Sequence, residues 1–180
     1  MLLNHCFSDS FINDSKLSRF VALWNNASVR HTVDGGSNCL FDLQQQMLKS
    51  LNTLADHHHH HLLLPPHLLT GDMDSIRADV LQHYRQQQNS PKVTIIETMD
   101  QEQTDFTKAI QVLSQQLGTL PAEHPVSLIL VFYSSSGRLD HVLSIYSTLY
   151  HFEKDVKVNA LPPLILVDLP GCSVSMLLSK

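Results

Sequence analysis

The chain has few cysteines and no excess of positive charge, and these two absences exclude several classes of protein. Its three cysteines, at positions 6, 39 and 172, are too few and too scattered for a disulfide framework or a zinc site. Lysine and arginine number 12 against 17 acidic residues, so the net charge is −5 and no basic field attracts nucleic acid. We therefore expect reduced thiols, a cytoplasmic location and no nucleic-acid partner.

Long hydrophobic segments are also absent. No apolar run approaches the roughly 20 residues that a bilayer-spanning helix needs. The N-terminus lacks the charged stretch followed by an apolar segment that is typical of a signal peptide. A hydrophobic fraction of 43% with 16% charged residues fits a globular chain of 180 residues with a core of its own. We expect a soluble protein without membrane association.

Strand-like apolar runs alternate with helix-like stretches along the chain. Strands are predicted at 1–4, 29–33, 67–70, 93–97, 126–133 and 164–168, and helices at 16–26, 76–88 (with Ser75 as N-cap), 105–117 (between Thr104 and Gly118) and 139–152. This alternation predicts an α/β fold, with a mostly parallel sheet flanked by helices in a Rossmann-like, three-layer arrangement. In such sheets ligands bind at the carboxyl ends of the strands.

Four acidic motifs fall at these strand ends or at helix starts. They are VDGG (33–36), GDMDS (71–75), DQEQTDFTKAI (100–110) and SSSGRLDH (134–141). Their aspartates are Asp34, Asp72, Asp74, Asp100, Asp105 and Asp140. Mg²⁺ prefers oxygen ligands and is usually held by a few carboxylates together with substrate phosphates. One such motif is a weak signal, but four in this order predict a single metal and phosphate site.

Each motif also has a simpler structural interpretation. Asp72 and Asp74 lie two residues apart and can face one ion, but the same turn can cap a helix, and a DxD pair also occurs in aspartyl-phosphate phosphatases. Lys108 can reach a phosphate or be solvated on its helix. Arg138 and Asp140 can hold phosphate and metal, or form a surface pair of little energetic value.

Together, the four motifs resemble those of the thiamin pyrophosphokinase family, also called thiamine diphosphokinase, over roughly residues 1–170. The family has an [A]DGG turn, a GDxDS turn, a D-x-x-x-TDF-x-K-A helix start and a GGxxGRxDH loop. The chain departs from this pattern in three places. Ser134 and Ser135 replace leading glycines, histidines 57–61 form an insertion that we interpret as a solvated loop, and the family's C-terminal domain is almost entirely absent.

The resemblance implies a homodimeric enzyme that uses Mg²⁺ to transfer diphosphate from ATP to thiamine, giving thiamine diphosphate and AMP. It implies that residues 1–160 form the catalytic α/β domain, which binds ATP and Mg²⁺. Residues 161–180 are then the truncated start of a β-sandwich domain that binds thiamine.

The resemblance also assigns expected roles to individual residues. The expected catalytic residues are Asp72, Asp74, Asp105 and Arg138. The expected Mg²⁺ ligands are Asp72, Asp74, Asp100 and Asp105. The residues expected to contact the nucleotide, its phosphates or the substrate are Asp34, Gln103, Thr104, Lys108, Arg138 and Asp140.

Two other functions stay open from the sequence. A Mg²⁺-dependent phosphohydrolase can use the same acidic cluster with water as the acceptor. A truncated isoform or fragment can fold and bind nucleotide without catalysis, which the early stop and the two serines favour.

Overall fold

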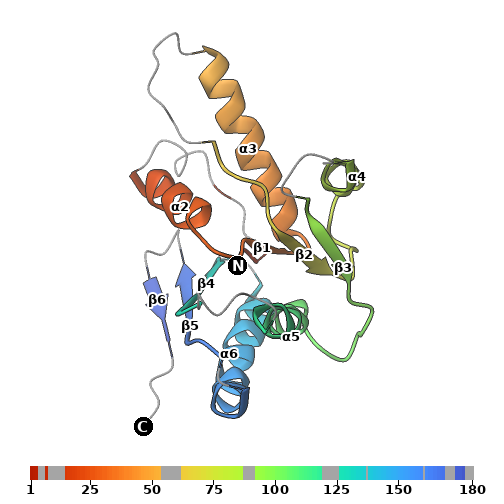
Figure 1. The fold of residues 1–180 in the computed structure, drawn as a ribbon, viewed down its shortest axis with the longest axis vertical. Coiled ribbons are helices and arrows are strands. Elements are labelled where there is room, and N and C mark those ends of the chain that lie inside the picture. The colour runs from red at the N-terminus through yellow and green to blue at the C-terminus, as the bar shows by residue number, and fades with distance from the viewer. Residues whose placement is uncertain are drawn as a thin grey trace.

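A computed structural model of the chain describes residues 1–3, 7, 15–53, 62–86, 92–118, 126–136, 138–159, 161–168 and 173–176 (Figure 1). Its helices are α2 (Ser15–Asn25), α3 (Gly36–Thr53), α4 (Ala78–Gln86), α5 (Asp105–Leu117) and α6 (Leu139–Asn159). Its strands are β1 (His31–Val33), β2 (Leu68–Gly71), β3 (Thr94–Glu97), β4 (Ile129–Tyr133), β5 (Leu164–Asp168) and β6 (Ser173–Ser175).

The strands form two three-stranded groups that meet at the first residues of the chain. β1, β2 and β3 pair in parallel in that order, β4 pairs in parallel with β5, and β6 pairs antiparallel with β5. Leu2 forms parallel bridges to Thr32 and to Phe132. Its amide donates to His31 O at 2.8 Å and its carbonyl accepts from Val33 N at 3.0 Å. The segment around Leu2 thus joins the two groups and aligns the carboxyl ends of β1 and β4.

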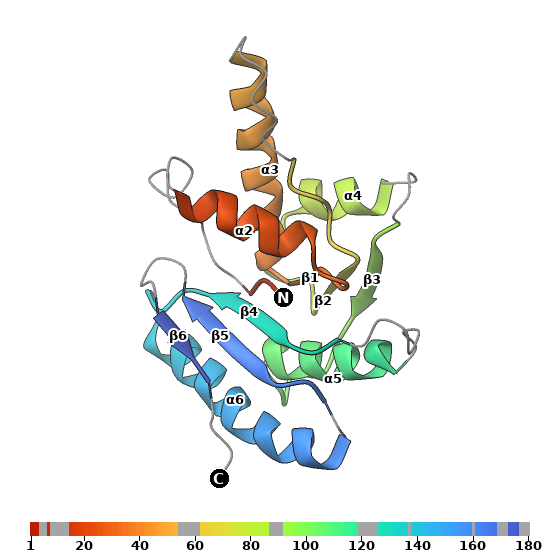
Figure 2. The same cartoon turned by 60° about the vertical axis from the view of Figure 1, so that its left-hand side comes forward.

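Helices cover both faces of the strands, with α2, α3 and α4 on one side and α5 and α6 on the other (Figure 2). The side chains of β4 alternate between these layers. Val131 and Tyr133 belong to the core cluster formed with α5 and α6, whereas Phe132 packs with α2 and α3. The predicted α/β architecture with a mostly parallel sheet and helices on both faces is confirmed.

The ends of α5 follow the chemistry of its sequence. Thr104 is the N-cap, and its Oγ1 accepts from Thr107 N at 3.2 Å. Gly118 follows the last helical residue, and its amide donates to Ser114 O at 3.3 Å. Both predicted boundaries are confirmed.

Two helix predictions need correction. Helix α3 was not predicted, although Leu40, Leu43 and Met47 are buried at helical spacing. Helix α4 begins at Ala78, and the prediction of Ser75 as its N-cap is wrong because the Ser75 hydroxyl donates to Asp74 Oδ1 at 2.9 Å.

The last described strands belong to the same layer as β4. β5 continues the parallel pairing, and β6 adds an antiparallel edge through Val167 and Val174. The start of a β-sandwich domain in 161–180 stays a prediction. Histidines 57–61 lie outside the described residues, as do 169–172 and 177–180.

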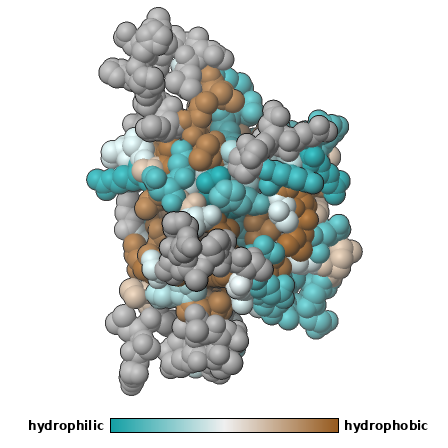
Figure 3. Space-filling view, viewed as in Figure 1, coloured by the Kyte–Doolittle hydropathy of each residue, from teal (hydrophilic) through white to brown (hydrophobic). Residues whose placement is uncertain are grey.

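Hydrophobic surface gathers along α3 and beside β3 in the view of Figure 3. β3 is the outer strand of its group, and its Ile95 and Ile96 are only half-buried. Among the described residues, no helix has the length and apolar character required to cross a membrane.

The central position of Leu2 gives a direct test of this architecture. Leu2 is fully buried and packs with Phe20, Trp24 and Phe132. We expect Leu2→Ala to lower the free energy of unfolding by about 2–5 kcal/mol, the usual cost of truncating a buried leucine. Leu23→Ala is the control because Leu23 on α2 is 50% exposed. Equal effects of the two substitutions in chemical denaturation would contradict the role assigned to Leu2.

Candidate functional site

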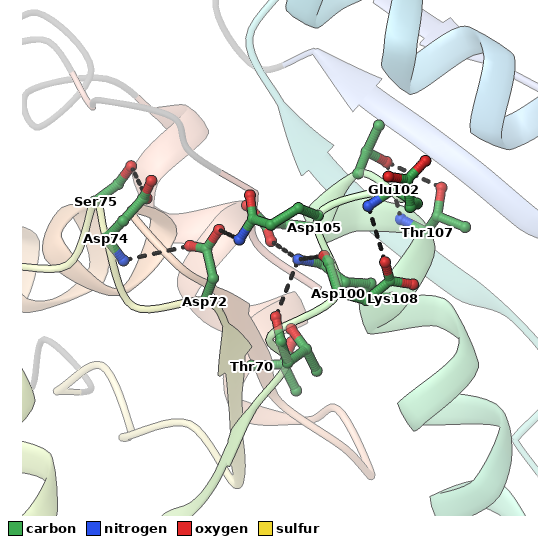
Figure 4. A network of polar contacts seen from close by, with 12 residues as sticks. Thr70, Asp72, Asp74, Ser75, Asp100, Glu102, Asp105, Thr107 and Lys108 are labelled. Carbon is green, nitrogen blue, oxygen red and sulfur yellow. Dashed lines mark hydrogen bonds and ion pairs between the residues drawn. The ribbon is translucent and has the colours of Figure 1, made fainter.

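Three carboxylates converge where β1 and β2 end. Asp34 directly follows β1, and Asp72 and Asp74 follow β2. One carboxylate oxygen from each lies within 4.8 Å of the other two. In Figure 4, Asp72 lies between Asp74 and the pair formed by Asp105 and Lys108. We call Asp34, Asp72 and Asp74 the acidic cluster.

The approach of the two strand ends depends on a glycine. Asp34 has φ 41°, and its amide continues the strand pairing by donating to Thr70 O at 2.7 Å. Gly71 has φ 149°, and a Cβ atom built there would lie 2.7 Å from Asp34 Cβ. Only glycine therefore lets the backbone of β2 pass so close to Asp34.

The GDMDS turn is held by contacts with α3. Met73 adopts φ 67°, and Asp74 N donates to Asp72 Oδ1 at 3.3 Å. Asn38 on α3 binds the far end of the turn, donating from Nδ2 to Ser75 O at 2.8 Å and accepting from Arg77 N at 2.9 Å. Asn38 was not among the predicted site residues, because nothing in its local sequence indicates this long-range contact.

The surroundings shift the pKa of two cluster residues in opposite directions. Burial raises the pKa of Asp34 above its usual range, and the charges of Asp105 and Asp74 add to the shift. For Asp72, burial works toward a higher pKa but is outweighed by hydrogen bonds from the Asp74 backbone and from Gln101, so the pKa is lowered. The cluster thus combines a carboxylate that resists ionisation with one that favours it.

Two buried oxygens near the cluster lack hydrogen bonds among the described residues. They are Asp34 Oδ1 and Asp105 Oδ1. Asp105 Oδ1 lies 2.8 Å from Lys108 Nζ as an ion pair, without the geometry of a hydrogen bond. Lys108 therefore already compensates the Asp105 oxygen, whereas Asp34 Oδ1 is a buried carboxylate oxygen without a donor, which is costly unless a cation binds it. The hard oxygen chemistry of these carboxylates fits Mg²⁺.

Lys108 is buried and binds the loop that follows β3. Its Nζ donates to Thr98 O at 3.1 Å and to Asp100 O at 2.9 Å, beside the ion pair with Asp105. The Asp100 side chain points to its own turn, accepting from Glu102 N at 2.8 Å. Lys108 therefore holds this loop against α5, and neither Lys108 nor Asp100 adds an atom to the acidic cluster.

Of the residues just before α5, one contacts the acidic cluster and the others make structural contacts. Gln101 was not predicted, yet its Nε2 donates to Asp72 Oδ2 at 3.3 Å. Gln103, which was predicted, accepts instead from Gln111 Nε2 at 2.8 Å. Thr104 caps α5 and lies 3.4 Å from Thr148 Oγ1 of α6.

Arg138 and Asp140 pair with each other at the surface. Arg138 Nε donates to Asp140 Oδ1 at 3.1 Å and Nη2 to Oδ2 at 2.5 Å. Both side chains are more than half exposed, and they do not join the acidic cluster. This mutual pairing raises the pKa of Arg138 and lowers that of Asp140.

A family profile described as "Thiamin pyrophosphokinase, catalytic domain" matches residues 20–160. The chain belongs to the thiamin pyrophosphokinase family. It is 32% identical to Thiamine pyrophosphokinase 2 of Oryza sativa subsp. japonica over 158 residues, which cover 87% of the chain and 55% of that relative. It is also 32% identical to Thiamine pyrophosphokinase 1 of Arabidopsis thaliana over 157 residues, with the same coverage.

Solved structures of the thiamin pyrophosphokinase family share the fold. The enzyme from Candida albicans superposes with a TM-score of 0.62 at 19% identity, covering 93% of this chain and 57% of that one. The yeast enzyme gives the same TM-score and coverage at 20% identity. The chain spans about half the length of the relatives it matches, 50% to 55% for the first three.

The raised pKa of Asp34 predicts how Asp34→Asn changes stability with pH. Below the usual carboxyl pKa of 3.8, Asp34 is protonated in both the folded and the unfolded chain, and its ionisation costs the fold nothing. As the pH rises through the raised pKa of the folded protein, ionisation of Asp34 destabilises the fold. In metal-free buffer we expect Asp34→Asn to be more stable than the parent at pH 7, and this advantage to vanish toward pH 3.

Denaturant titrations at several pH values measure this difference. Asp79→Asn is the control, because Asp79 is exposed on α4. An Asp34→Asn advantage that does not depend on pH, or that grows in acid, would contradict the effect assigned to burial of this carboxylate.

The contacts of Lys108 predict a structural effect. Lys108→Met keeps much of the side-chain length but leaves two carbonyls and Asp105 without their partner. We expect the free energy of unfolding to fall by about 2–3 kcal/mol, as for other hydrogen-bonded charges that are largely buried. The exposed Lys92→Met is the control. Unchanged stability together with weakened Mg·ATP binding would show instead that Lys108 acts on phosphate.

Proposed function

We propose that the chain supplies the nucleotide- and metal-binding part of a thiamine diphosphokinase. In this reaction the hydroxyethyl oxygen of thiamine attacks the β-phosphorus of ATP. The bond from that phosphorus to the oxygen bridging the α- and β-phosphates breaks, and AMP leaves with this oxygen. The hydroxyl proton passes to a carboxylate of the site. The convergence of Asp34, Asp72 and Asp74, in a chain of this family, is the observation that carries the proposal.

The donor set supports Mg²⁺ as the cofactor. When bound, Mg²⁺ neutralises charge on the phosphates and supplies Lewis acidity. Asp34, Asp72 and Asp74 would hold it, and Asp105 offers a further buried oxygen nearby. These carboxylates lie at the carboxyl ends of parallel strands, where ligands of α/β sheets bind. Hydrogen bonds to their carboxylate oxygens already orient two of them, Asp72 and Asp74.

The chain's own residues contribute mainly by positioning the phosphates. Thr104 and Asp105 open α5, whose N-terminus favours anionic groups. Arg138 would exchange Asp140 for a phosphate, which accepts the same two parallel hydrogen bonds. Phosphoryl transfer depends largely on such positioning and on electrostatic stabilisation. The turn before α5 is held in place by contacts of Gln103, Lys108 and Asp100.

We propose nucleotide binding for the described part of the chain. Transfer of diphosphate to thiamine is proposed for the whole protein. The chain spans about half the length of its relatives, and thiamine binding is part of the proposal. A homodimer and a cytoplasmic location are part of the same proposal.

A thiamine-dependent AMP release assay tests the function. Equal amounts of AMP and thiamine diphosphate, formed only with thiamine and Mg²⁺ present, support diphosphate transfer. Phosphate release without thiamine would indicate a phosphohydrolase. Mg·ATP binding without any turnover would indicate a chain that binds nucleotide without catalysis.

The acidic cluster predicts the effect of single amide substitutions. Asp72→Asn and Asp74→Asn each remove a charge from the cluster while keeping the side-chain shape. We expect Mg·ATP affinity to fall on the order of 10- to 100-fold or more, with an unchanged fold. Isothermal titration calorimetry with Mg·ATP measures this fall.

Glu97→Gln provides the matched control. Glu97 ends β3 at the same edge of the sheet, but it is exposed and outside the cluster. If all three variants bind Mg·ATP as the parent does, the GDMDS turn is only a helix-entry turn.

A further inference from the structure

Asp168, the last residue of β5, is a buried carboxylate that the proposed reaction does not use. Only 1% of its surface is exposed. No ion pair found among the described residues includes it. A buried carboxylate is costly unless hydrogen bonds satisfy it, and an apolar residue could fill the same space at less cost. Its burial therefore indicates that a specific hydrogen-bond donor binds it.

That partner is Ser135, in the loop between β4 and α6. Asp168 Oδ1 accepts from Ser135 N at 3.4 Å, and Asp168 Oδ2 accepts a short hydrogen bond from Ser135 Oγ. Both the backbone and the side chain of Ser135 are thus bound by one carboxylate. We call this pair of contacts the Ser135–Asp168 clamp.

The two ends of the same loop are also fixed. Tyr133, at the end of β4, is buried, and its hydroxyl lies 2.8 Å from that of Tyr146 on α6. The Tyr146 hydroxyl lies 3.2 Å from Ser175 Oγ of β6. The clamp therefore acts on a segment whose preceding strand and following helix are already joined.

Arg138 depends on this segment for its position. It lies three residues after Ser135 and directly before α6. Its side chain is 73% exposed and is paired with Asp140, which is itself 59% exposed. Little packing surrounds the guanidinium, so apart from its pair with Asp140 its reach depends on where the backbone places Arg138.

We propose that Asp168 is a positioning residue, which acts through Ser135 to hold the turn that presents Arg138 to the phosphates of the nucleotide. The proposal rests on the proposed function, since it assumes that Arg138 binds phosphate. Ser135 is the specific element, because its backbone N–H and its hydroxyl both donate to Asp168, and removing the hydroxyl leaves only the backbone donor.

A double-mutant cycle on Mg·ATP binding tests the clamp in the full chain. Calorimetric Kd values are compared for the parent, Ser135→Ala, Arg138→Ala and the double variant. We expect Ser135→Ala to weaken Mg·ATP binding about tenfold when Arg138 is present, as for the loss of one charge-assisted contact. In the Arg138→Ala background the same substitution is expected to have no effect.

Further variants separate positioning from general stability. Ser135→Thr keeps the hydroxyl and is expected to bind Mg·ATP as the parent does. Ser136→Ala, the control, removes a neighbouring hydroxyl whose described side-chain contact is Ser134. Asp168→Asn is expected to weaken binding in the same direction as Ser135→Ala, and if it fails to fold, the Ser135 cycle decides alone.

The outcomes test the role of the clamp and the proposed function separately. If Ser135→Ala lowers the affinity for Mg·ATP equally with and without Arg138, or does not lower it at all, the positioning role of the clamp is overturned. The proposed function is not affected by that result. A parent chain that binds no Mg·ATP overturns the proposed function, and the positioning role of Asp168 with it.

Discussion

The site depends on the close parallel approach of two strand ends, β1 at Asp34 and β2 at Gly71. The hydrogen bond from Asp34 N to Thr70 O extends the strand pairing past β1, and Gly71 leaves room for the Asp34 side chain. This approach brings three carboxylates within 4.8 Å of one another, one of them buried. Burial and the neighbouring negative charges oppose the ionisation of Asp34, and this weakens the fold until a cation binds.

The rest of the structure resists this repulsion by anchoring each acidic segment to a different element. Asn38 of α3 holds the turn after β2, and Lys108 of α5 holds the loop after β3. Leu2 aligns the two strand groups so that the loop after β4 lies at the same edge as the cluster. The carboxylates are therefore fixed by contacts outside the cluster, as a preorganised metal site requires.

Periodicity and local chemistry were enough to predict the architecture. The buried run of β4 and the Thr104 cap of α5 have local signals, and both were predicted from them. Helix α3 was missed because the glycines at 35–36 were interpreted only as a turn, whereas Gly36 also starts the helix. The spacing of Leu40, Leu43 and Met47 was the signal that would have revealed it.

Contacts between distant segments explain what the sequence could not predict about the site. The motifs indicated acidic residues at strand ends, and the structure brings Asp34, Asp72 and Asp74 together there. The burial of Lys108, the contact of Gln101 with Asp72 and the Ser135–Asp168 clamp each join segments that no local pattern relates. The pairing of Arg138 with Asp140 was one of two open interpretations, and only the arrangement in space shows it.

The most direct test of the central claim is the position of a bound ion. Crystals grown with Mn²⁺, which replaces Mg²⁺ at oxygen sites and has a measurable anomalous signal, locate the ion without assuming its ligands. The account predicts an anomalous peak at about 2.0–2.3 Å from carboxylate oxygens of Asp34, Asp72 and Asp74. A peak bound elsewhere, or a cluster that stays without an ion at saturating Mn²⁺ and ATP, would contradict it.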